Sequence, residues 1–187
     1  NNIKNVKLFH GDLFQDNFKK ESFDLVWSSG VLHHTPDPKK GFFKMLEYVK
    51  KDGYVIIGLY NKYFRVSTYI KKILYKVFGK KILFYIDPLL KKNKFSKNQQ
   101  NAWIRDQYEH PLESTHSYEE VMQWFNEKNV EIINFYPNYQ EFSEINIFKK
   151  NNENLKNKFN LFILQLSKIF SLYGDDGGLF LMIGKKN

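Results

Sequence analysis

Short apolar runs that stop abruptly in small or polar residues recur along this chain, and they predict an alternation of buried strands and helices. The clearest run, residues 23–27, stops at Ser28, Ser29 and Gly30. A mostly apolar run of this length suits a strand that is covered on both faces, as the strands of parallel sheets are. Ligands of open α/β sheets bind just beyond the carboxyl ends of such strands. The small residues after this run therefore indicate a place where a ligand can approach the backbone closely.

A helix and a second strand follow this first strand. The sequence predicts a helix over residues 38–49, with Asp37 as its cap, a proline at its first position and Gly53 as its stop. Residues 54–60 are the next apolar strand. The order strand, helix, strand predicts a right-handed parallel crossover, which is the repeating unit of a doubly wound sheet. A further short strand is predicted at residues 6–9.

The second half of the chain contains the signals for one more helix and two more strands. Ser117 and Glu120 have the spacing of a capping box, and they predict a helix that runs through Lys128. Residues 130–135 are the next predicted strand, and residues 179–183 are the last one. The chain is thus expected to form a single α/β domain.

Two longer segments interrupt this alternation. The first spans about 62–116, and near 66–78 its apolar residues recur at helical spacing with lysines between them, which predicts a basic amphipathic helix. The second lies between the last two strands, where residues 155–170 have the pattern of another helix. The polar and aromatic residues that end the first segment are typical of a substrate lid, although an ordinary polar loop explains them equally well.

The positive charge of the chain is local. The formal net charge is +9, and residues 62–97 alone contain eleven basic side chains against the single acid Asp87. Only Arg65 and Arg105 are arginines. Since bidentate recognition of phosphates and bases uses arginine more than lysine, the composition does not favour a nucleic-acid partner.

The chain contains no cysteine, which excludes disulfides and thiolate metal sites and fits a cytoplasmic location. Its five histidines lack the paired spacing of a zinc site, so no metal is expected. No apolar run approaches the roughly 18 residues that a membrane-spanning helix needs.

Three segments carry a family resemblance: GDLF, FDLVWSSGVLHHTPDP and LEYVKKDGYVIIGLYN. In this order they resemble the middle of class I S-adenosylmethionine-dependent methyltransferases, in particular the group that includes the ubiquinone and menaquinone biosynthesis enzymes. The resemblance covers residues 5–61 well and 117–136 more loosely. It implies a Rossmann-like α/β fold with an antiparallel last strand, a core formed by residues 1–61 and 117–187, and a helical lid or insertion over about 62–116.

The resemblance also implies a partial fold. Enzymes of this family begin with a strand, a glycine-rich turn and a second strand that ends in an acidic residue, and the family's sheet order is 3-2-1-4-5-7-6. We expect this chain to be a copy truncated at its N-terminus, without those first strands and that turn. Because the turn brings the backbone close to the cofactor, such a fragment is expected to bind S-adenosylmethionine poorly.

The resemblance assigns cofactor roles to four residues. It places the carboxylate of Asp12 on the amino group of adenine, Leu13 against the adenine ring, and Ser28 and Ser29 near the methionine portion. The alternatives are that Asp12 caps a turn after Gly11 and that the serines only allow close packing of a helix on a strand.

Candidates for catalysis and substrate binding lie at the same strand ends. His34, and with less support His33, can act as the base that removes a proton from the methyl acceptor. Methyl transfer needs little beyond alignment, however, and the histidines can simply cap backbone groups. Tyr60 and Asn61 end the next strand and face the same crevice, and His116 belongs to the polar segment before the capped helix. We expect these three to orient the substrate, although they can equally just finish the strand and the loop.

The sequence thus predicts methyl transfer from S-adenosylmethionine to a small-molecule or lipid-like acceptor. The basic helix near 66–78 can lie on an anionic membrane, or its apolar face can cover the substrate as a lid. A degenerate interaction module without catalysis is the alternative. A nucleic-acid methyltransferase is not favoured, because the N/D-P-P-Y/F signature of amino-group methylation is absent at the first strand end.

Overall fold

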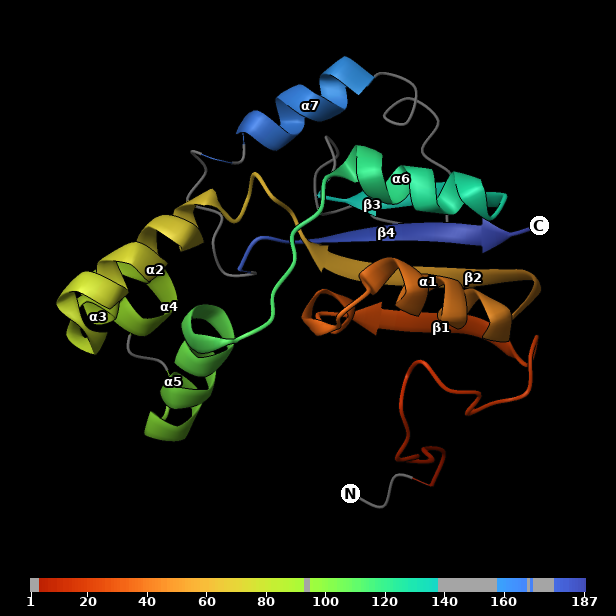
Figure 1. Ribbon diagram of the computed structural model, residues 1–187, viewed down its shortest axis with the longest axis horizontal. Coiled ribbons are helices and arrows are strands. Elements are labelled where there is room, and N and C mark those ends of the chain that lie inside the picture. The colour runs from red at the N-terminus through yellow and green to blue at the C-terminus, as the bar shows by residue number, and fades with distance from the viewer. Residues whose placement is uncertain (1–3, 93–94, 138–157, 168, 170–176) are drawn as a thin grey trace.

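The computed structural model describes residues 4–92, 95–137, 158–167, 169 and 177–187, and it forms a mixed four-stranded sheet with helices packed against it (Figure 1). The strand order is β1-β2-β4-β3, with β1 parallel to β2 and β4 antiparallel to both β2 and β3. The strands are β1 Phe23–Ser29, β2 Val49–Tyr60, β3 Val130–Tyr136 and β4 Leu179–Lys186. The predicted α/β class and the antiparallel last strand are confirmed, and the order reproduces the 4-5-7-6 part of the expected sheet.

The crossover from β1 through α1 (Pro38–Tyr48) to β2 forms as predicted. The side chain of Asp37 accepts a hydrogen bond from the amide of Lys40 at 2.9 Å, so it caps the helix. The predicted stop at Gly53 is wrong. The helix already ends at Tyr48, and Gly53 lies inside β2, where a side chain would come within 3.0 Å of the carbonyl oxygen of Asp24. Close approach of β1, rather than helix termination, therefore requires glycine at this position.

Helix α6 (Tyr118–Glu127) begins at Ser117, whose side chain accepts from the amide of Glu120 at 3.3 Å. This is half of the predicted capping box. The carboxylate of Glu120 lies 2.8 Å from Nδ1 of His116 rather than reaching back to the amide of Ser117. Helix α7 (Lys158–Ser167) forms within the helix predicted at 155–170, whereas Ile169 lies in a turn after it; residues 155–157, 168 and 170 lie outside the described residues.

The main core lies between one face of the sheet and the helices α1, α6 and α7. Phe42 of α1 stacks on Phe125 of α6 with ring centroids 4.6 Å apart, and Leu161 of α7 is fully buried in the same cluster. On the opposite face, Ile56 and Ile183 form a smaller cluster with Ile133. Burial of these side chains holds β2 and β4 at the centre of the sheet.

The predicted strand at residues 6–9 is wrong. Residues 4–22 contain no strand, and the side chains of Leu8 and Phe9 are 93% and 69% exposed. A strand needs the backbone of a neighbour to pair with, and β1 lies at the edge of the described sheet with no strand along its outer side. The segment is instead tied to α1, because the hydroxyl of Tyr48 accepts from the amide of Asn17 and donates to the carbonyl of Gln15.

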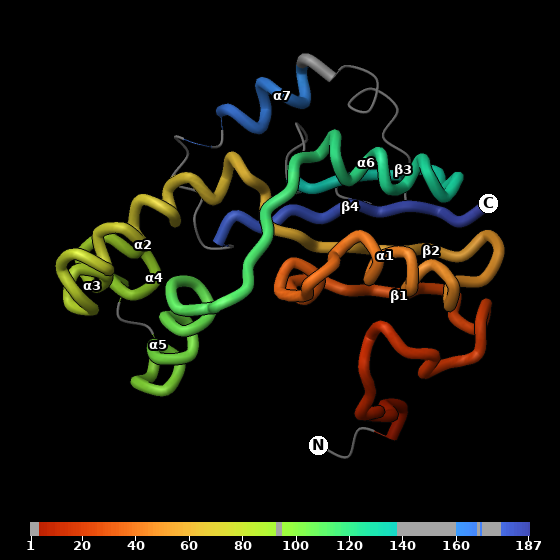
Figure 2. Tube along the Cα trace, in the orientation of Figure 1, coloured from red at the N-terminus to blue at the C-terminus, as the bar shows by residue number. Residues whose placement is uncertain are grey.

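The segment between β2 and α6 forms a lobe of short helices beyond one end of the sheet (Figure 2). Its helices are α2 Val66–Phe78, α3 Leu83–Ile86, α4 Pro88–Lys91 and α5 Lys97–Ile104, followed by a π-helical turn over Arg105–Glu109. It has a small core of its own around Leu83, Leu90 and Ile104. None of the helices in the described part of the chain is long and apolar enough to cross a membrane.

The buried carboxylate of Asp87 organises this lobe. One oxygen accepts from the amides of Leu89 and Leu90 at 2.9 and 3.0 Å, which caps α4. The other accepts from the hydroxyl of Tyr108 at 2.5 Å and from the indole of Trp103 at 3.1 Å. One acidic side chain thus joins three segments of the lobe.

Candidate functional site

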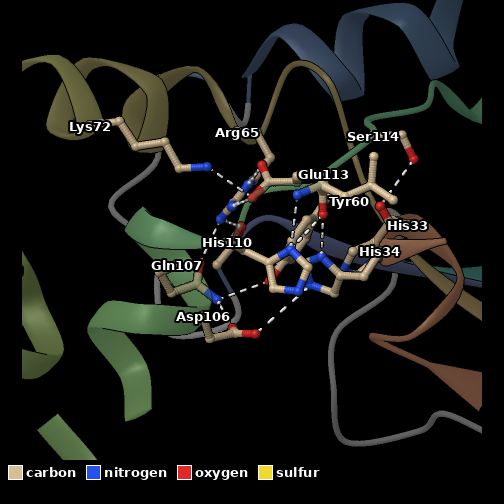
Figure 3. A network of polar contacts seen from close by, with 12 residues as sticks. His33, His34, Tyr60, Arg65, Lys72, Asp106, Gln107, His110, Glu113 and Ser114 are labelled. Atoms are coloured by element: carbon tan, nitrogen blue, oxygen red, sulfur yellow. Dashed lines mark hydrogen bonds and ion pairs between the residues drawn. The ribbon is translucent and has the colours of Figure 1, made fainter. Parts of the chain in front are cut away.

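The candidate site lies where the carboxyl ends of β1 and β2 meet the helical lobe. After β1, the chain turns at Gly30 and enters a short 3-10 helix, Leu32–His34, that carries both histidines. Tyr60 is the last residue of β2, and Asn61 follows it. The π-helical turn brings Asp106 and Gln107 close to the histidines and Tyr60 (Figure 3). The structure therefore brings the predicted catalytic histidines and Tyr60 together.

Tyr60 lies between two stacked groups. The imidazole of His33 stacks on the phenol ring with centroids 3.8 Å apart, and the guanidinium carbon of Arg65 lies 3.8 Å from the centroid of the same ring. Because the imidazole and the guanidinium both lie this close to one ring, they must occupy its opposite faces. The hydroxyl of Tyr60 accepts from Nε2 of Gln107 at 2.9 Å, and burial raises its pKa. The phenol is therefore neutral at physiological pH.

Arg65 is fully buried and every part of its guanidinium is used. Its Nε and Nη2 donate to the two carboxylate oxygens of Glu113 at 3.1 and 2.6 Å, and its Nη1 donates to Gln107 and to the carbonyl of Gly177. Lys72 adds a third bond to Glu113 at 2.9 Å. Burial alone raises the pKa of Glu113, but the hydrogen bonds and charges of Arg65 and Lys72 outweigh it and hold the pKa below its ordinary value.

His33 is buried without a partner. Its side chain is inaccessible to solvent, and neither ring nitrogen makes a hydrogen bond within the described residues. Burial, and then the charges of His34 and Arg65, lower the pKa of His33 to about 3. An unpaired buried polar group costs free energy, and such groups concentrate at functional sites. As a neutral ring with a very low pKa, His33 is a poor base.

His34 has the geometry of a base. Its Nδ1 lies 2.9 Å from the carbonyl oxygen of Leu112, and since a carbonyl can only accept, Nδ1 carries the proton. Nε2 is then the nitrogen with the free electron pair. It has no hydrogen-bond partner among the described residues, and the nearest carboxylate, Asp106, lies 3.8 Å away. The ring of His110 packs on His34 with centroids 3.8 Å apart.

Asn61 and His116 join the lobe to the sheet. Their backbones form an isolated parallel bridge, and the side chain of Asn61 donates to Gln165 and accepts from the amide of Tyr63. The ring nitrogens of His116 lie 3.0 Å from Oγ of Ser114 and 2.8 Å from the carboxylate of Glu120. Both side chains are thus occupied by internal contacts, and a substrate contact requires one of these to be exchanged.

The expected cofactor residues lie along the exposed side of β1. Asp12 is exposed, and one of its oxygens accepts from the amide of Phe14 at 2.9 Å, as the turn alternative predicts. Leu13 is half-buried and lies beside Leu32 and Gly41, near the carboxyl end of β1.

The two serines pair with the central strand. Ser28 pairs with Ile57, and Ser29 pairs with Gly58, where an added Cβ would come within 2.6 Å of Oγ of Ser29. Ser29 is exposed, and an added Cβ at Gly30 would meet nothing within 4 Å. These small residues fit the close approach of a cofactor, and they also serve the close packing that the alternative predicts.

The buried ion network of Arg65, Glu113 and Lys72 was not predicted from the sequence. One signal was available, because Arg65 is one of only two arginines in a chain rich in lysine. Arginine in such a background indicates a position that needs a planar, bidentate partner.

Comparison with known proteins gives a family match over part of the chain. Residues 1–57 match the model of the methyltransferase domain family. This match covers most of the segment, residues 5–61, in which the sequence best resembles the class I S-adenosylmethionine-dependent methyltransferases.

Several solved structures of such enzymes are similar to the chain. A S-adenosylmethionine-dependent methyltransferase from Thermotoga maritima is 18% identical, with a TM-score of 0.44 over 97% of this chain and 65% of that one. One from Methanosarcina mazei is 15% identical, with a TM-score of 0.47 over 94% and 65%. A methyltransferase from Bacillus halodurans is 16% identical, with a TM-score of 0.44 over 94% and 69%. The chain thus spans about two thirds of the length of these structures.

Proposed function

We propose that this chain takes part in methyl transfer from S-adenosylmethionine to a small-molecule or lipid-like acceptor, with His34 as the general base. The observation that carries the proposal is Nε2 of His34, which is buried without a hydrogen-bond partner among the described residues near the carboxyl end of β1, inside a segment that matches a methyltransferase domain. The absence of cysteine favours a cytoplasmic location for this reaction.

Methyl transfer requires few catalytic groups from the protein. Bound S-adenosylmethionine supplies a methyl group on a sulfonium that leaves readily. The chain has to align the acceptor and take up its proton. The bond from Nδ1 of His34 to the carbonyl of Leu112 fixes the tautomer, so Nε2 is the nitrogen that can take up the proton. Because Nε2 is buried from solvent in this structure, an acceptor reaches it only after neighbouring side chains move. His33 and Tyr60 are packed behind it and act as positioning residues for the ring.

We further propose that these 187 residues alone bind the cofactor more weakly than micromolar. The support is exposure: Asp12 and Ser29 are exposed, and Leu25 and Trp27 of β1 are 40% and 58% exposed. A ligand held on such an open strand keeps much of its surface in water, whereas small-molecule sites bury most of their ligand. Calorimetric titration with S-adenosylmethionine measures this directly, and micromolar binding would refute it.

Methyl transfer is tested with labelled S-adenosylmethionine at concentrations high enough to compensate for weak binding, against a panel of hydroxyl and acidic-carbon acceptors. Replacement His34→Gln is expected to lower kcat roughly a hundredfold while cofactor affinity stays unchanged. His10→Gln, an exposed histidine outside the site, is the matched control. Equal kcat for His34→Gln and the parent chain would remove the base role. Transfer by neither protein at saturating cofactor would remove the enzymatic function.

A second candidate is an interaction module without catalysis. It is favoured by the internal contacts that occupy Asn61 and His116, two residues expected to hold the substrate. The same experiment separates the two functions, because a module neither transfers the label nor responds to His34→Gln.

A further inference from the structure

Helix α2 is turned so that its polar side faces the protein. Lys72 donates to the buried carboxylate of Glu113 at 2.9 Å, and the hydroxyl of Tyr75 donates to Glu109 at 2.6 Å. Thr68 is the buried residue of this helix, with 7% of its surface exposed. The ring of Tyr75 also packs against the small core of the lobe, beside the ring of Tyr108. Polar and apolar contacts thus both hold α2 to the rest of the lobe, and the interpretation in which the apolar face of the helix covers a substrate as a lid stays a prediction.

The apolar side of α2 faces solvent instead. Ile70, Ile73 and Val77, which recur at helical spacing, are 55%, 62% and 68% exposed, and Phe78 at the end of the helix is 65% exposed. We call these four side chains the outer α2 face. An amphipathic helix normally buries its apolar side, so an exposed one indicates a surface that binds an apolar partner.

Exposed lysines outnumber exposed acids in the segment that carries the outer α2 face, although Glu109 from the π-helical turn bonds to Tyr75 of the same helix. Lys76 in the last turn of α2 is exposed, as are Lys80 and Lys81 directly after the helix and Lys91 in α4. The only acid among residues 62–97 is Asp87, which is 3% exposed and accepts four hydrogen bonds inside the lobe. No negative side chain of this segment therefore offsets its lysines at the surface.

We propose that the outer α2 face docks on an anionic membrane surface. A helix lying in the interface buries its apolar side among the acyl chains, while flanking lysines lie at the level of the negatively charged headgroups. The positive charge of the lysines decides which kind of partner fits this face. A second copy of the same face would bring like charges together, which disfavours self-association. A nucleic acid would leave the isoleucines and Val77 without an apolar partner. The proposal goes beyond methyl transfer and does not depend on it.

Sedimentation with lipid vesicles tests the proposal on the full 187-residue chain. The chain is expected to co-sediment with vesicles in which phosphatidylserine replaces part of the phosphatidylcholine, and much less with phosphatidylcholine alone. The double replacement Ile73→Gln and Val77→Gln is expected to weaken partitioning roughly tenfold or more. The matched control is Phe162→Gln with Ile163→Gln, two side chains of α7 that are 40% and 44% exposed.

Charge is tested separately. Replacement of Lys76 and Lys81 by glutamine is expected to weaken partitioning on anionic vesicles about tenfold or more, and to make it less sensitive to salt. Exposed lysines outside the lobe, Lys19 and Lys51, are the matched control. Thermal melting of each variant verifies that it remains folded, since all the replaced side chains are exposed.

Three outcomes would overturn the proposal. Equal sedimentation with neutral and anionic vesicles removes the charge argument. Unchanged partitioning of the Ile73 and Val77 variant would show that the outer α2 face is not the membrane-binding surface. Self-association of the parent chain that this same variant abolishes, without vesicle binding, assigns the face to a second copy.

Discussion

The imidazole of His33 stacks on the phenol ring of Tyr60, with the two ring centroids 3.8 Å apart. This contact joins the turn after β1 to the end of β2. It also excludes water from His33, whose ring nitrogens find no partner among the residues described. The stability of the fold should therefore depend on pH through this one side chain.

The pH dependence has a definite sign. Because burial lowers the pKa of His33 to about 3 in the folded state, the unfolded chain binds the proton first, below the ordinary pKa of about 6.5. Stability then falls as the pH drops from about 6.5 toward 3, by up to about 1.4 kcal/mol per pH unit. Above this range His33 is neutral in both states and contributes no slope.

Urea unfolding at a series of pH values measures this slope. The variant His33→Phe retains a ring on Tyr60 and should flatten the slope between about pH 6.5 and 4.5. Glu113, whose folded pKa is lowered, begins to lose its contribution as the pH approaches the ordinary carboxylate value of 4.5. The upper part of this window therefore isolates the histidine from this carboxylate. His10→Gln should leave the slope unchanged. An unchanged slope in His33→Phe would contradict the prediction.

Loss of the Glu113 carboxylate should destabilise the protein strongly. Glu113→Gln leaves the guanidinium of Arg65 buried without its anionic partner, and the expected loss is about 3 kcal/mol in the free energy of unfolding. Asp24→Asn, which breaks the exposed pair with Lys50, should change stability little. Chemical denaturation of both variants tests the contrast, and equal losses would show that the buried network contributes no more than a surface pair.

Asp87→Asn should loosen the lobe selectively. The replacement removes the charge that accepts from Tyr108, Trp103 and the amides of α4, at an expected cost of about 2 kcal/mol or more. Hydrogen exchange should become faster in α3, α4 and α5 and stay slow in β2, because the lobe has its own core. Asp106→Asn, an exposed acid, is the control. Uniformly faster exchange across β2 would show that lobe and sheet unfold together.

Gly58→Ala tests the close packing of β1 on β2. The added methyl would lie within 2.6 Å of Oγ of Ser29 and 2.8 Å of a methyl carbon of Leu181. Such overpacking should cost about 1–3 kcal/mol. The second replacement Ser29→Ala removes one of the two clashes and should restore part of the loss. If Gly58→Ala leaves the free energy of unfolding unchanged, β1 and β2 can move apart enough to accept the methyl group.

Local signals were sufficient to predict the first crossover. Asp37 caps its helix as the sequence indicated, and Ser28 and Ser29 form the carboxyl end of β1, followed by Gly30. The strand at residues 6–9 could not be excluded in this way, since an apolar run forms a strand only beside a neighbour. The extent of β2 was likewise underestimated, because Val49 already pairs with Phe23 of β1, across an irregularity in the ladder that resumes at Tyr54.

The candidate site was predicted only in part. The proximity of both histidines to Tyr60 could be predicted because strand ends are visible in the sequence, whereas their roles stay a prediction. The pairing of Arg65 with Glu113 joins residues 48 positions apart, and no local pattern reports such a contact. The direction of α2 was also beyond the sequence: periodicity reveals two faces of a helix, whereas which one turns inward depends on the tertiary partners of Lys72 and Tyr75.

The hydrogen bonds of Arg65 restrict the movement of α2. It directly precedes α2, and its guanidinium is bonded at once to Glu113, to Gln107 and to the carbonyl of Gly177 just before β4. Rotation of α2 away from the sheet would have to break all of these bonds together. These bonds fix the orientation of α2 relative to the strands. A partner that binds the outer α2 face therefore also fixes the orientation of the two histidines relative to that partner.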